Sequence, residues 1–295
     1  MNYLVLDVGG SAIKYALMND DLEMLEKGKV PTPKDSLAAF KNAVKDLYEK
    51  YQDQVDGIAM SLPGLINKQT SKVQVPGALL YNQDADILAQ LQSVTTKRFA
   101  IENDAKCAAL CEVEYGSLKG TDVGAVCIIG SGIGGGITIG DKVFTGVHGF
   151  AGEFSYLSTK WDEQDGFNSK WGFDSSALKL VKMIGKAVGK EEIEGPEAFE
   201  YCNNGDKRAL EALSKFCDIV AMGLFNIQAF VDPDKIAIGG GISQQPILHE
   251  YIQKSLDQIY QKMPIPIPQA NIVPCAYYND SNLIGALANY KKIFK

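Results

Sequence analysis

Histidine and tryptophan are scarce in this chain, with two of each among 295 residues, and the six cysteines include no Cys-x-x-Cys pair. Cys107 and Cys111 share a helical face at i and i+4, but a structural metal site needs two further ligands at suitable spacing. Neither His148 nor His249 supplies that spacing. We therefore interpret the cysteines as reduced, mostly buried thiols.

The sequence also lacks an excess of basic charge and any long apolar run. Its 29 Lys and Arg residues against 36 Asp and Glu give a net charge of −7 and a pI near 5.0, so we expect no nucleic-acid or anionic-membrane partner. No apolar run approaches the roughly 18 residues that span a bilayer, and no basic segment precedes Asp7 as in a secretory signal. We expect a cytoplasmic protein with room for two domains.

Glycine, by contrast, is concentrated at residues 130–136, where five glycines in seven residues leave a backbone almost free of side chains. Such a loop can direct its N-H groups at an anion. The segment follows an apolar strand pattern at 123–129 and matches Gly-x-Gly-x-x-Gly. A dinucleotide site needs a helix next, whereas a Gly140-Asp141 turn predicts a β-hairpin, and no Gly-Lys-Ser/Thr completes a P-loop.

The same arrangement of strand, glycine loop and returning strand occurs at residues 3–18, around Gly9-Gly10-Ser11. Two phosphate-sized hairpins about half the chain apart indicate an internally duplicated α/β protein that holds one nucleotide from both sides. Two ordinary glycine-rich hairpins remain the alternative at this point.

The order of the remaining elements supports a duplication. The first half predicts three antiparallel strands, then helix, strand, helix, strand and helix, which is a ribonuclease H-like plan. Strands resume at residue 123, and a third glycine loop follows a strand at 239–241. Residues 67–82 are expected to be irregular, and residues 158–173 form a loop that contains Trp161 and Trp171.

Six motifs in register resemble those of the ROK family of sugar kinases over nearly the whole chain. They are Leu6-Asp7-Val8-Gly9-Gly10-Ser11-x-x-Lys14, Leu62-Pro63-Gly64, Glu102-Asn103-Asp104-Ala105, the loop at 130–136, Ala151-Gly152-Glu153 and Ile238-Gly239-Gly240-Gly241. The resemblance implies an α/β, actin/hexokinase-like fold made of two ribonuclease H-like lobes that close on ATP, Mg²⁺ and a hexose. The implied lobes are residues 1–117, completed by the last helix at 281–295, and residues 118–280.

The resemblance also implies a role for each matching residue. Asp104 is the implied catalytic base, and Asp7 positions Mg²⁺ through water. The implied sugar ligands are Asn103, Asp104, Glu153, Gly64, Gly77 and Tyr156. The implied ATP and phosphate ligands, besides Asp7, are Gly9, Gly10, Ser11, Lys14, Gly130, Ser131, Gly132, Ile133, Gly134, Gly135, Gly239, Gly240 and Gly241.

The chemistry of phosphoryl transfer agrees with these roles. Its loose transition state needs the sugar hydroxyl to be positioned and the γ-phosphate charge to be neutralised, which backbone amides and Mg²⁺ can do. A carboxylate of ordinary pKa suffices as the base, and Asp104 follows a strand and precedes a helix. A simple helix cap at Asp104 and a solvated carboxylate at Glu153 are the alternatives.

The chain departs from the family pattern after Glu153. Ser155-Tyr156 replaces the usual Gly-His, and residues 157–175 contain no cysteine, so we expect no zinc. The second acidic sugar ligand is not recognisable near residues 171–175. These changes fall on the anomeric side of the sugar and favour a zinc-free β-glucoside kinase acting on cellobiose-like sugars.

Three alternatives to this substrate prediction remain open: N-acetylmannosamine kinase, glucokinase and a non-catalytic sugar-sensing regulator. The regulators of this family carry an N-terminal DNA-binding domain, which we expect to be absent, and they need no catalytic base. Tyr156, Trp161 or Trp171 would support a second sugar ring, or the tryptophans replace zinc as a hydrophobic staple. A homodimer is an open alternative for assembly.

Overall fold

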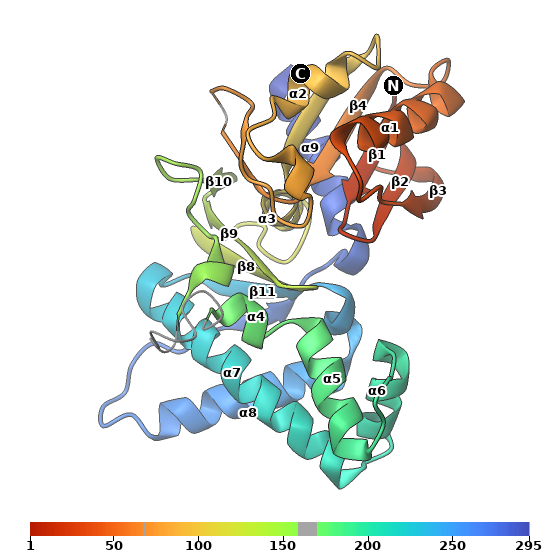
Figure 1. Ribbon diagram of the computed structural model, residues 1–295. Coiled ribbons are helices and arrows are strands. Elements are labelled where there is room, and N and C mark those ends of the chain that lie inside the picture. The colour runs from red at the N-terminus through yellow and green to blue at the C-terminus, as the bar shows by residue number, and fades with distance from the viewer. Residues whose placement is uncertain (68, 159–169, 295) are drawn as a thin grey trace. The chain divides into compact units, whose positions relative to one another are not determined.

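The computed structural model describes residues 1–67, 69–158 and 170–294, and it divides into two compact units (Figure 1). Unit 1 comprises Met1–Cys111, Thr145–Ala151 and Asp280–Lys295, and unit 2 comprises Glu112–Phe144 and Gly152–Asn279. The lobe boundaries expected from the sequence stay a prediction.

Unit 1 is built on a five-stranded sheet in the order β3-β2-β1-β4-β7. Its strands are β1 Asn2–Val8, β2 Ala12–Asn19, β3 Met24–Pro31, β4 Gly57–Leu62 and β7 Arg98–Asn103. The first three are antiparallel, whereas β4 runs parallel to both β1 and β7. Since β1 and β4 are central, nearly every residue in them is buried.

Helices accompany this sheet. They are α1 Leu37–Tyr51, α2 Ile87–Gln92, α3 Asp104–Glu114, which starts in this unit, and α9 Ser281–Phe294. Ser36 caps α1 by accepting a hydrogen bond from the Ala39 amide, as its place before the apolar run predicts. Phe40 and Val44 of α1 join Leu4 and Leu6 of β1 in one core, and α9 lies against β1, β4 and β7.

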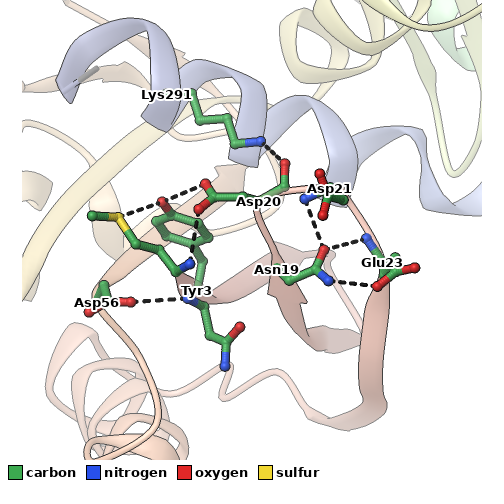
Figure 2. Close-up of polar contacts among 9 residues, drawn as sticks. Tyr3, Asn19, Asp20, Asp21, Glu23, Asp56 and Lys291 are labelled. Atoms are coloured by element: carbon green, nitrogen blue, oxygen red, sulfur yellow. Dashed lines mark hydrogen bonds and ion pairs between the residues drawn. The ribbon is translucent and has the colours of Figure 1, made fainter.

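Hydrogen bonds at the start of β1 fix this end of the sheet to α9 (Figure 2). The Tyr3 hydroxyl donates to Asp20 Oδ1 over 3.1 Å, and Lys291 of α9 donates to the Asp20 carbonyl. Asn19 Oδ1 accepts from the amides of Asp21 and Glu23, which closes the turn between β2 and β3. The first strand is therefore held at the end opposite its glycine loop.

Unit 2 repeats the arrangement with the order β10-β9-β8-β11-β12. Its strands are β8 Val123–Ile129, β9 Ile133–Ile139, β10 Lys142–Phe144, β11 Lys235–Gly239 and β12 Ile272–Pro274. Again the first three are antiparallel and the last two run parallel. The predicted duplication of a ribonuclease H-like unit is thus confirmed strand by strand.

A helical bundle accompanies the second sheet (Figure 1). Its members are α4 Trp171–Asp174, α5 Ala177–Val188, α6 Gly195–Asn203, α7 Lys207–Val231 and α8 Pro246–Gln261. The long helix α7 packs against α5, α6 and α8 and supplies Phe216, Val220 and Leu224 to the core. Single turns of 3₁₀ helix at Phe154–Tyr156 and Gly241–Gln244 lie beside predicted site segments.

The structure corrects two local predictions. Strand β9 already begins at Ile133, so the loop after β8 is only Gly130, Ser131 and Gly132. The segment expected to be irregular, residues 67–82, contains strand β6 Val73–Val75 and a 3₁₀ turn at Leu80–Asn82. Strand β6 pairs with β5 Leu65–Ile66, which lies just before the segment.

Two broader expectations concern cysteines and membranes. All six cysteines are buried and free, as predicted. Within the described ranges, no helix is both long and apolar enough to cross a membrane.

Candidate functional site

Asp7 is a buried carboxylate with three side-chain partners. It lies near the end of β1 and is 5% exposed. Its Oδ1 accepts hydrogen bonds from the Ser61 hydroxyl and the Asn282 amide, both at 3.0 Å. Its Oδ2 lies 3.3 Å from the ammonium of Lys14. A buried carboxylate is tolerated here because three donors surround it.

Hydrogen bonds within the turn and from Thr32 fix the backbone of the first glycine loop, Gly9-Gly10-Ser11. The Gly9 amide donates to the Ala12 carbonyl across the turn. Thr32, just after β3, donates its hydroxyl to the Gly9 carbonyl and its amide to the Ser11 carbonyl. A Cβ on Gly10 would lie 3.1 Å from Ala78 Cβ, so the loop touches the segment that follows β6. No local pattern had marked Thr32 as part of the site.

A second cluster in unit 1 joins Gly64, Gly77 and Asn103. Gly64 has φ +106, and a Cβ there would lie 2.3 Å from the Val75 carbonyl, so only glycine fits. A Cβ on Gly77 would be 3.1 Å from the Gly64 amide nitrogen. The Asn103 amide donates to the Gly64 carbonyl at 2.9 Å. The structure thus brings three predicted sugar ligands together.

Asn103, rather than Asp104, caps helix α3. Its Oδ1 accepts from the Lys106 amide at 3.0 Å, while Asp104 is the first residue of the helix. Each end of the Asn103 amide group keeps the capacity for one more hydrogen bond. The half-buried Asp104 side chain stands at the positive end of α3, and its Oδ1 accepts a hydrogen bond from the Ala105 amide at 2.8 Å. Because this amide belongs to the first turn, the helix-cap alternative for Asp104 stays open beside the catalytic one.

Negative charge gathers around the start of α3. Burial, followed by the negative charges of Glu102, Asp104 and Asp7, raises the pKa of the Cys107 thiol well above its usual range. Lys106, which is only 3% exposed, places a positive charge within the same helical turn. Sequence reasoning missed Lys106, although its position two residues after Asp104 was visible.

In unit 2 the loop Gly130–Gly132 presents bare backbone. The Gly130 amide donates to the Gly132 carbonyl, and the Gly130 carbonyl accepts from Ala177 at the start of α5. A Cβ on either glycine would meet nothing closer than 3.8 Å. By contrast, the Ile133 side chain is 5% exposed and belongs to the core. Only its backbone, with that of Gly134, remains available to a ligand.

Two other glycine segments adjoin this loop. A Cβ on Gly239 would lie 2.6 Å from Ile128 Cδ1, and one on Gly240, at φ +97, would lie 2.2 Å from the Ile129 carbonyl, so these two glycines pack closely on the end of β8. A Cβ on Gly135 would lie 2.3 Å from the Gly152 carbonyl. Gly135 and Gly239 therefore serve close packing, whereas Gly241 is exposed.

Glu153 and Tyr156 belong to the segment that begins at Gly152. Both side chains are half-buried, and Lys170 places its ammonium 5.6 Å from the centre of the Tyr156 ring. Trp171 is 1% exposed, donates from Nε1 to the Ile219 carbonyl and abuts Gly223 of α7. Trp171 is thus part of the scaffold and cannot support a second sugar ring. Trp161 lies outside the described residues.

The residues present fit Mg²⁺ and ATP. Mg²⁺ is commonly bound through one or two carboxylates together with water and phosphate oxygens, and Asp7 offers one fixed carboxylate. Among the described residues no three His, Cys, Asp or Glu side chains cluster as metal ligands. The bare loops at 9–11 and 130–132 offer N-H groups for phosphates.

The sequence matches known proteins along its length. The model of the ROK family matches residues 3–293. The chain is 28% identical to an N-acetyl-D-glucosamine kinase of Haemophilus influenzae, over 86% of this chain and 88% of that protein. It is 27% identical to a beta-glucoside kinase of Listeria monocytogenes, over 98% and 97%.

Among solved structures, the chain resembles a ROK family protein from Streptococcus pneumoniae TIGR4 in complex with sucrose. The TM-score is 0.85, at 29% identity and 99% coverage of both chains.

Proposed function

The chain belongs to the ROK family and is a sugar kinase of that family, and we propose that it transfers the γ-phosphate of ATP to the 6-hydroxyl of a hexose or hexoside. The observation that carries the proposal is the arrangement in unit 1. There Asn103 caps α3 and bonds Gly64, and Asp104 begins the same helix. The Asp104 carboxylate therefore lies next to the Asn103 amide group, which can form further hydrogen bonds to sugar hydroxyls.

Asp104 is the proposed general base. The oxygen of the 6-hydroxyl attacks the γ-phosphorus, the bond from that phosphorus to the bridging oxygen breaks, and ADP leaves with the electron pair. The hydroxyl proton passes to the Asp104 carboxylate. Because the transition state is loose, the proton leaves late, so orientation by α3 matters more than high basicity.

The remaining roles divide between phosphate and sugar. The loops at 9–11 and 130–132 bind phosphate oxygens through amides other than those of Gly9 and Gly130, which already donate within the loops. Lys14 is a nearby cation, and the segment 239–241 binds adenosine. Mg²⁺, held by Asp7 through water, would neutralise phosphate charge. Asn103, Gly64, Gly77, Glu153 and Tyr156 orient the sugar.

We propose a β-glucoside as the preferred substrate. The exchange of Gly-His for Ser155-Tyr156 removes groups from the anomeric side and leaves room for an aglycone. The likeness to a beta-glucoside kinase extends over nearly all of both chains, and the Streptococcus pneumoniae protein was solved with a disaccharide. Of the two candidate rings that the structure describes, Tyr156 and Trp171, Tyr156 remains a candidate for contact with the second sugar.

An N-acetylhexosamine is the second candidate substrate. The observation in its favour is the 28% identity to an N-acetyl-D-glucosamine kinase, over 86% of this chain. N-acetylmannosamine and free glucose are tested beside N-acetylglucosamine. All three sugars would place a 6-hydroxyl at Asp104, and they differ only at other ring positions.

A coupled ADP-release assay tests activity and substrate together. The panel comprises cellobiose, gentiobiose, glucose, N-acetylglucosamine and N-acetylmannosamine. We expect kcat/KM to be higher for the disaccharides, because remote binding energy is used at the reacting centre. A preference for a monosaccharide by more than about tenfold, roughly 1.4 kcal/mol, would exclude the β-glucoside assignment. No ADP release with any sugar would contradict the kinase itself.

A further inference from the structure

The Asp7 carboxylate is bonded asymmetrically by residues to which no role has been assigned. Ser61 and Asn282 both donate to Oδ1, at 3.0 Å each. Oδ2 instead faces Lys14 at 3.3 Å, and that lysine side chain is 46% exposed. One oxygen is therefore committed to buried or half-buried protein donors, while the other meets a cation that solvent reaches.

The sheet register explains why these groups meet. Asp7 of β1 pairs with Lys14 of β2 on one side and with Ser61 of β4 on the other. Side chains at matched positions on neighbouring strands share one face of a sheet, so both reach the same carboxylate. Asn282 arrives from the first turn of α9, whose positive end also favours the negative charge.

We infer that Ser61 and Asn282 are positioning residues, which fix the Asp7 carboxylate so that Oδ2 is presented to the hydrated Mg²⁺ of bound nucleotide. This inference rests on the proposed function. The terminal torsion of an aspartate is broad, and two donors on one oxygen restrict it to one orientation. A metal held through water depends on that orientation, because the water must bridge two fixed points.

The fixed orientation of the Asp7 carboxylate also affects Lys14. Its ammonium is the group at Oδ2, and Lys14 lies in β2, three residues after Ser11, where the predicted phosphate loop ends. With Oδ1 committed elsewhere, Lys14 is free to exchange Oδ2 for a phosphate oxygen when nucleotide and Mg²⁺ bind. The carboxylate then passes from one cation to another without rotating.

The test measures the Mg²⁺ dependence of ADP binding rather than turnover. Calorimetry gives the Kd of ADP with Mg²⁺ and with EDTA, and the ratio of the two measures coupling between metal and nucleotide. The set comprises wild type, Asp7→Ala, Ser61→Ala and Asn282→Ala. Asn289→Ala is the matched control, because that asparagine also lies on α9 but contacts the Ile101 carbonyl. Ser61→Cys retains volume if Ser61→Ala is unstable.

We expect Asp7→Ala to abolish the coupling, and Ser61→Ala and Asn282→Ala to reduce it about tenfold each. Binding in EDTA should stay unchanged in Ser61→Ala and Asn282→Ala, and Asn289→Ala should behave as wild type throughout. If Asp7→Ala abolishes the coupling but Ser61→Ala and Asn282→Ala leave it unchanged, the inference about Ser61 and Asn282 is wrong and the proposed role of Asp7 stands. Coupling that is the same in wild type and Asp7→Ala overturns the proposed role of Asp7, and the inference with it.

Discussion

Individual glycines in this protein serve two purposes that substitution can separate. A Cβ added at Gly132 would meet no atom closer than 3.8 Å, so we expect a valine there to be compatible with the fold. We expect Gly132→Val to fold normally and to raise the Kd of ATP by at least about tenfold, because the branched side chain enters the path of the phosphates. Calorimetric titration of ATP measures this, and unchanged affinity would contradict a phosphate role for the loop.

Gly240 is the matching structural case. Its φ is +97, and a Cβ would lie 2.2 Å from the Ile129 carbonyl. We expect Gly240→Ala to lower the free energy of unfolding by about 2–4 kcal/mol, from the left-handed backbone and the overlap together. Denaturant unfolding measures this free energy. A variant as stable as wild type would contradict the close approach of residue 240 to the Ile129 carbonyl.

At the residue scale, the site residues that belong to continuous motifs could be recognised from the sequence. Those that come from distant parts of the chain could not. Asp7, Asn103 and Asp104 stand in recognisable stretches. Thr32 and Asn282 reach the same region from the ends of other elements, so no local pattern marks them. Ser61 could have been found, because it directly precedes Leu62-Pro63-Gly64.

At the element scale the crossing of α3 and α9 determines where Asp104 stands. Gly285 of α9 lies against α3, so a Cβ there would fall 1.8 Å from the Cys107 carbonyl. We expect Gly285→Ala to destabilise the protein by about 3 kcal/mol or more, because two helix backbones must separate. Thermal unfolding checks this. Gly195→Ala is the control, since its Cβ meets only Val181 at 4.0 Å, and equal stability of the two variants would contradict the expectation.

The packing of α4 on α7 gives a second test at this scale. Trp171→Phe removes the hydrogen bond to the Ile219 carbonyl and leaves space beside Gly223. We expect a loss of about 2 kcal/mol in stability. The ratio of kcat/KM for cellobiose to that for glucose should not change. A selective loss of disaccharide activity would return Trp171 to the sugar site.

Most elements were predictable because their patterns are local. Alternation and apolar runs gave β1, β2, β4 and β8, and Ser36 gave the start of α1. The short pair β5 and β6 was missed, because two or three residues carry no periodicity and the pairing depends on Gly64 and Gly77. The early start of β9 was missed because glycine hides strand alternation.

At the scale of the whole molecule, the two sheets repeat one strand order while their additions differ. Unit 2 carries the helical bundle and the segment after Glu153, where the sequence departs from the family pattern. We expect the purified protein to contain no stoichiometric zinc, because residues 155–175 supply neither histidine nor cysteine. Elemental analysis measures the metal, and about one zinc per chain would show that ligands come from elsewhere.

The catalytic account depends above all on Asp104, and a neighbouring carboxylate provides the control. Glu102 and Asp104 both act electrostatically on Cys107, yet only Asp104 begins α3. We expect Glu102→Gln to retain most of its turnover. Asp104→Asn keeps shape and hydrogen bonding but cannot accept a proton, so sugar should still bind.

The most direct measurement is therefore the kcat of Asp104→Asn with the preferred sugar, beside the Kd of that sugar. The account predicts a fall in kcat of about 10² to 10⁴-fold with the Kd little changed. An Asp104→Asn enzyme that keeps more than about a tenth of the wild-type kcat would contradict it.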